Sequence, residues 1–173
     1  MVQRQQFAKY VDAYFDTDPE WRALLDQHLE PLPFNTVYKW ILRTKCSVEK
    51  GTRVAKKALP LVGDLLAYLL TADLTYAGQV AQPNVQTIGD AISKLRKKGA
   101  WSGLHQAKQL LAASPSSQEV KTAFCRVYEF LDSHLTPNEQ DLIQFDPIMV
   151  EHTLCKYQQL MRELKGTCGQ GEF

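Results

Sequence analysis

The chain has no long hydrophobic run and no closely spaced cysteines. Its longest apolar stretch, residues 58–70, is interrupted by Pro60, Gly63 and Asp64 and is too short to cross a bilayer. The four cysteines lie far apart and include no CxxC pair. This spacing argues against a disulfide framework and a zinc site, and no metal or cofactor is expected. Reduced cysteines are typical of the cytoplasm or the nucleus, where we expect the protein.

The motifs by which many enzymes are recognised are also missing. The sequence holds no phosphate-binding loop and no dinucleotide fingerprint. The four histidines fall in separate segments without the Glu-x-x-His spacing of di-iron bundles. Ser47 to Lys50 matches an S-x-x-K pattern, but its partner motifs are lacking, and Ser47 is expected to cap a helix instead. We therefore predict a non-enzymatic protein without catalytic residues.

Period-two alternation and Asn-Gly or Asp-Gly hairpin signals are absent, whereas helical periodicity runs through almost the whole chain. Capping boxes at Ser116 with Glu119 and at Thr136 with Glu139 predict two helix starts. We predict an all-α fold, an irregular multi-helix bundle or short superhelix of roughly nine to eleven helices. The expected helices cover residues 2–15, 19–29, 35–45, 48–59, 61–71, 74–82, 86–98, 102–113, 117–134, 137–145 and 147–165.

The links between these helices are short, which favours one helical domain over residues 1–165. A sub-boundary is expected near residues 114–117, where a Ser-Pro-Ser-Ser link coincides with a change in charge. Residues 166–173 contain three glycines and are expected to form a disordered tail.

Charge is strongly separated along the chain. Residues 39–108 carry twelve of the twenty Lys and Arg residues but only four carboxylates, a net charge of +8. Residues 1–30 carry −3 and residues 109–173 carry −4, so the near-neutral total of +1 hides this separation. A basic region of this kind indicates an acidic partner.

The basic residues of the middle region form two clusters, which we predict to bind that partner on one positive surface. The first precedes residue 58 and the second follows residue 93, where lysines near a helix C-terminus are also accounted for by the helix dipole. The expected binding residues are Lys39, Arg43, Lys45, Lys50, Arg53, Lys56, Lys57, Lys94, Arg96, Lys97 and Lys98.

Three functions remain open from these residues. The first is binding of an acidic protein segment; the second is binding of nucleic acid by the same cations, with Tyr38 and Trp40 stacking on bases. The alternative prediction is that the side chains of Tyr38 and Trp40 lie in the hydrophobic core. The third is an assembly role, in which the C-terminal helices oligomerise through the stripe Val150, Leu154, Tyr157, Met161 and Leu164. The oligomeric state is not determined by the sequence.

The run from Thr87 to Lys98, followed by Ala107-Lys108-Gln109-Leu110-Leu111, shows a further pattern. Together with its flanks, residues 73–113, it resembles the helical N-terminal domain of transcription elongation factor S-II. Related bundles occur in Elongin A and in the integrase-binding domain of lens-epithelium-derived growth factor. This resemblance implies a nuclear, non-enzymatic scaffold that binds short acidic and hydrophobic motifs of transcription or chromatin regulators.

Overall fold

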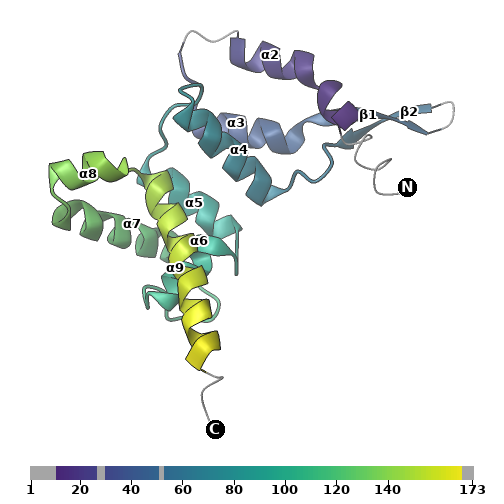
Figure 1. The fold of residues 1–173 in the computed structure, drawn as a ribbon. Coiled ribbons are helices and arrows are strands. Elements are labelled where there is room, and N and C mark those ends of the chain that lie inside the picture. The colour runs from purple at the N-terminus through teal and green to yellow at the C-terminus, as the bar shows by residue number, and fades with distance from the viewer. Residues whose placement is uncertain (1–10, 27–29, 51–52, 169–173) are drawn as a thin grey trace. The chain divides into compact units, whose positions relative to one another are not determined.

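A computed structural model describes residues 11–26, 30–50 and 53–168 of the chain (Figure 1). By its internal contacts the chain divides into two compact units, Met1–Gln82 and Pro83–Phe173. The single domain expected over 1–165 spans both units, and the sub-boundary expected near 114–117 lies inside the second. Within the described residues no helix is both long and apolar enough to cross a membrane.

The fold is mostly helical, as predicted, with eight helices and one two-stranded hairpin among the described residues. After a helical turn at residues 11–15, the first unit contains α2 (Asp18–Asp26), α3 (Phe34–Arg43), β1 (Lys45–Lys50), β2 (Arg53–Ala58) and α4 (Asp64–Tyr76). The second unit contains α5 (Val85–Lys94), α6 (Gly99–Gln106), α7 (Ser117–His134), α8 (Pro137–Ile143) and α9 (Pro147–Cys168).

The hairpin replaces the helix predicted over residues 48–59, and here the all-α prediction is wrong. The strands are antiparallel, with Lys45 opposite Ala58 and Lys50 opposite Arg53. At the start of β1 burial alternates from residue to residue, as in a strand: Cys46 is buried, whereas Lys45 and Ser47 on either side are more exposed. The linking pair 51–52, which lies outside the described residues, starts with glycine in the sequence, a signal for a two-residue hairpin turn.

Several helix boundaries also differ from the predictions. One helix, α4, replaces the two predicted at 61–71 and 74–82, because the sequence between them contains no breaker. Inside it the hydroxyl of Thr71 donates to the Ala67 carbonyl and that of Thr75 to the Thr71 carbonyl. Helix α6 ends at Gln106, not at 113, and the next residues turn through Lys108, whose φ is 56°.

The core of the first unit lies between α3 and α4. Helix α3 buries Phe34, Val37, Tyr38 and Ile41 on one face. The ring of Phe34 packs against Tyr68 of α4, with ring centroids 5.8 Å apart. Each fully buried side chain of this size stabilises the unit by about 1.5–3 kcal/mol before entropy costs, so this face holds the two helices together.

In the second unit α5 packs on α7 and α6 packs on α9. Ile88 and Ile92 of α5, Leu104 of α6, and Phe124 of α7 are among the fully buried side chains. Helix α9 continues to Cys168, so the first residues of the predicted disordered tail lie in this helix. Its C-terminal half extends past the other helices of the unit (Figure 1).

Candidate binding surface on the β1–β2 hairpin

The hairpin is anchored at its base to the N-terminal residues of the same unit. Cys46 and Leu59 form a small buried cluster with Ala13. The Tyr14 hydroxyl donates a hydrogen bond to the Pro60 backbone carbonyl at 2.8 Å, and the two residues are 46 positions apart in the sequence. These contacts fix the start of β1 and the end of β2, and thereby position the residues that the strands carry.

Four of the predicted binding residues lie exposed around this hairpin: Arg43, Lys45, Lys56 and Lys57. We call them the basic hairpin surface. Lys56 is opposite Ser47 in the register and is therefore a diagonal neighbour of Lys45 on the same face of the ribbon. Lys57 follows Lys56 and takes the opposite face, beside Cys46. Arg43 ends α3, one residue before β1 starts.

Asp16 is the carboxylate that the structure places against this surface. It accepts a hydrogen bond from the backbone N–H of Ser47 at 2.6 Å. This hydrogen bond, with a smaller contribution from the positive charge of Lys56, lowers the Asp16 pKa below its usual value. Asp16 thus stays ionised at neutral pH, satisfies an outward-facing amide of β1, and partly offsets the charge of Lys56.

Of the two aromatic residues predicted as base-stacking candidates, the structure places Tyr38 in the core and leaves Trp40 partly exposed. Tyr38 is buried, and its hydroxyl donates to Asp64 Oδ1 at 2.9 Å. Burial is also the main cause that raises the Tyr38 pKa. Trp40 is half-buried and meets Trp21 edge-on, with ring centroids 4.5 Å apart. Tyr38 is therefore a core residue and cannot stack on a base.

The structure describes the other three predicted binding residues of the first unit, Lys39, Lys50 and Arg53, in less detail. Lys39 is exposed on α3. Lys50 and Arg53 face each other in the register beside the turn, and their side chains lie outside the described part of the structure. The prediction that Ser47 caps a helix is wrong. Ser47 lies in β1, which replaces the start of the predicted helix.

The second basic cluster belongs to the other unit. Lys94 ends α5, whereas Arg96, Lys97 and Lys98 lie in the link before α6, and all four are exposed. The helix dipole therefore accounts for Lys94 alone, because the other three follow the helix end. Seven of the predicted residues belong to the first unit and four to the second.

The described residues contain no metal-type cluster, and one of their thiols is hydrogen-bonded to a carboxylate. Among them no group of three His, Cys, Asp or Glu side chains is arranged to hold a metal ion. The Cys155 thiol donates to the buried carboxylate of Glu151 at 3.1 Å. Burial, together with this carboxylate, raises the Cys155 pKa, which disfavours the nucleophilic thiolate.

No family model, no curated protein and no solved structure matches the chain. The resemblance of residues 73–113 to the S-II domain therefore stays a prediction. The boundary between the units, after Gln82, falls inside that segment. The sequence predicts the cations of the hairpin but not the hairpin itself or the contribution of Asp16.

Proposed function

We propose that the first unit is a non-enzymatic interaction module that binds an acidic protein segment through the basic hairpin surface. The observation that carries the proposal is the exposure of Arg43, Lys45, Lys56 and Lys57 on and beside one anchored hairpin. Clustered exposed cations attract acidic partners and accelerate their association. The buried cluster at the hairpin base gives these cations a fixed support.

Nucleic acid is a second candidate partner, and the ribbon geometry favours it. Lys56 and Lys57 point to opposite faces of a two-stranded antiparallel ribbon. The major groove of duplex DNA admits such a ribbon, and cations on both faces suit the phosphates on either side. The burial of Tyr38 removes one of the two stacking residues expected for single strands, so a duplex is the form to test.

The decisive comparison uses two double charge reversals of equal size. Lys56→Glu with Lys57→Glu alters the hairpin, and Lys97→Glu with Lys98→Glu alters the exposed link in the other unit. Binding of a labelled poly-glutamate peptide and of a labelled DNA duplex is measured by fluorescence anisotropy. We expect the hairpin variant to bind about tenfold more weakly and the link variant to bind as the parent does. Equal weakening in both variants would show that net charge, not the hairpin, determines binding.

A salt titration separates the two partners. Duplex binding through phosphates predicts that log K falls with log salt at a slope of about −0.9 per neutralised phosphate. No retention of the duplex at low salt excludes nucleic acid, and no binding of either probe refutes the module. Both variants should keep the parent's circular dichroism and melting temperature, because exposed charges contribute little to stability.

A further inference from the structure

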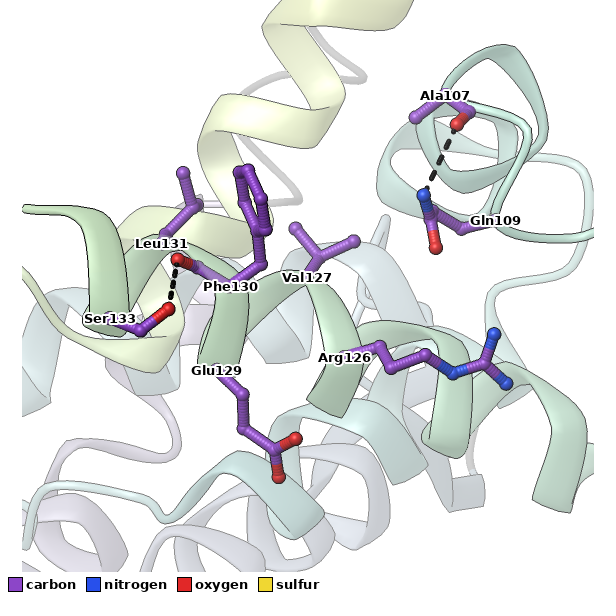
Figure 2. Close-up of a pocket in the computed structure, with 8 residues that line it drawn as sticks. All are labelled: Ala107, Gln109, Arg126, Val127, Glu129, Phe130, Leu131 and Ser133. Atoms are coloured by element: carbon purple, nitrogen blue, oxygen red, sulfur yellow. Dashed lines mark hydrogen bonds between the residues drawn. The ribbon is translucent and has the colours of Figure 1, made fainter.

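A hollow in the second unit carries charges of both signs. It has a volume of about 560 Å³ and lies beside α7 (Figure 2). Arg126 and Glu129 both line it, so its charge favours neither an acidic nor a basic partner. Strand β2 of the first unit differs in this respect. It carries Arg53, Lys56 and Lys57 and no acidic residue, so its charge favours an acidic partner.

The hydrogen bond to Asp16 shows which backbone groups of the hairpin face outward. In an antiparallel pair, opposite residues alternate between pairs that exchange hydrogen bonds and pairs whose backbone groups point away from each other. The Ser47 N–H donates to the Asp16 carboxylate and so faces away from β2. Ser47 and its register partner Lys56 are therefore a pair of the second kind. The backbone N–H and C=O of Lys56 point away from β1, as do those of Val54 two residues earlier.

The two outer edges of the hairpin differ in what they contact. On the edge of β1, the Asp16 carboxylate accepts from the Ser47 N–H at 2.6 Å. On the edge of β2, no hydrogen bond joins the backbone of Val54 or Lys56 to another element of the described chain. The six residues of β2 span about 20 Å as a strand. An edge of this kind is a template to which another strand can add.

Charge decides which strand can add to β2. A second copy of β2 would bring lysines against lysines, and like charges opposite each other destabilise a strand pair. An acidic strand instead places carboxylates beside Lys56 and Lys57, which are exposed on opposite faces of the ribbon. Asp16 provides an example within the chain, because its carboxylate combines an outward backbone N–H with the positive charge of Lys56.

We propose that an extended acidic segment of a partner protein adds to the outer edge of β2 as a third strand, with its carboxylates beside Lys56 and Lys57. This inference rests on the proposed function and specifies the partner as extended, not helical. Hydrogen bonds to the backbone of Val54 and Lys56 supply affinity, and the lysines select acidic side chains. The buried cluster at the hairpin base holds the edge in place before the partner binds, so little ordering accompanies binding.

Amide hydrogen exchange of the full chain, followed by NMR, tests the backbone pairing. The probe is a peptide of alternating Glu and Thr. The N–H groups of Val54 and Lys56 should exchange at least about fivefold more slowly with saturating peptide than in the free protein. The N–H groups of Ala55 and Lys57 face β1 and are the internal control, because their bonds to β1 are present in both states. Unchanged exchange at Val54 and Lys56 in the saturated complex overturns the strand addition.

A proline substitution tests the same bonds without a change in charge. Val54→Pro removes an outward N–H, and proline is tolerated on an edge strand where the N–H faces solvent. Val54→Thr keeps the N–H and is the matched control. In fluorescence anisotropy, the proline variant should bind the peptide about fivefold more weakly than the parent, and the threonine variant should bind as the parent does. Binding of equal strength by the proline variant and the parent overturns the proposal, and if that variant loses the hairpin, the exchange measurement decides.

The charge reversal of the hairpin separates this inference from the proposed function. If Lys56→Glu with Lys57→Glu binds the peptide as tightly as the parent, the proposed function fails. If that variant loses the peptide while Val54→Pro keeps it, the acidic partner binds through side chains alone, and only the strand addition is overturned. Binding of a DNA duplex but not of the peptide overturns both in favour of nucleic acid.

Discussion

At the residue scale, two glycines set how closely α6 approaches α9. A Cβ atom at Gly103 would run into the backbone carbonyl of Leu154, which cannot move away as the end of a flexible side chain does. Gly99 has a φ of 41°, and a Cβ atom there would lie 2.6 Å from Cys155 Sγ. The four-residue spacing of these glycines lets α6 lie directly against the α9 backbone.

Gly103→Ala should therefore destabilise the second unit by about 1–3 kcal/mol, the range for overpacking in a closely packed interior. The measurement is urea unfolding followed by circular dichroism. Ser102→Ala, one position earlier in α6, adds no such contact and should be near neutral. Gly89→Ala meets Lys121 Cα at 3.2 Å and should cost less than Gly103→Ala. Equal stability of the Gly103 variant and the parent would contradict the close approach.

At the element scale, the starts of α7 and α8 are local features that the sequence predicts correctly. In both capping boxes the side chain of the first residue accepts from a backbone N–H and the glutamate returns the contact. The Glu119 carboxylate accepts from the Ser116 backbone N–H at 2.7 Å, and its pKa is lowered mainly by that bond. The same arrangement joins Glu139 to Thr136. Only residues three apart are involved, so no tertiary information is needed.

Ser116→Ala should lower the stability of the second unit by about 1 kcal/mol, as expected for loss of an N-cap. Ser117→Ala, the neighbouring exposed serine, is the control. Because the folded Glu119 pKa is lowered, its stabilisation is present above the unfolded carboxyl pKa and is lost as pH falls through the folded value. Glu119→Gln, which removes the titrating carboxylate, should therefore lose less stability than the parent between neutral and acidic pH. Parallel pH profiles of unfolding free energy in the two proteins would refute this capping role.

At the scale of the whole molecule, the chain consists of two compact units that divide after Gln82. The charge separation follows this division only in part, because the +8 of residues 39–108 extends over both units. The basic hairpin surface belongs to the first unit, so the proposed function concerns that unit.

If the two units unfold independently, a substitution in the core of one unit should change the stability of that unit alone. With Gly103→Ala, amide hydrogen exchange should accelerate in α6 and α9 and stay at the parent rate in α3 and α4. Exchange measured by mass spectrometry resolves these peptides. Acceleration of the same size in α3 and α4 would show that the two units unfold as one cooperative body.

The sequence by itself determined the helical character of most of the chain, the start of α7 at Ser117 and of α8 at Pro137, and the position of the exposed cations. These features depend on periodicity and on contacts between residues three or four apart. Tertiary structure decided that residues 45–50 and 53–58 pair as strands, because burial of Cys46 with Ala13 and Leu59 joins segments distant in the sequence. It also decided that Tyr38 is buried. Such outcomes depend on which distant segments pack together, and the local sequence pattern does not specify this packing.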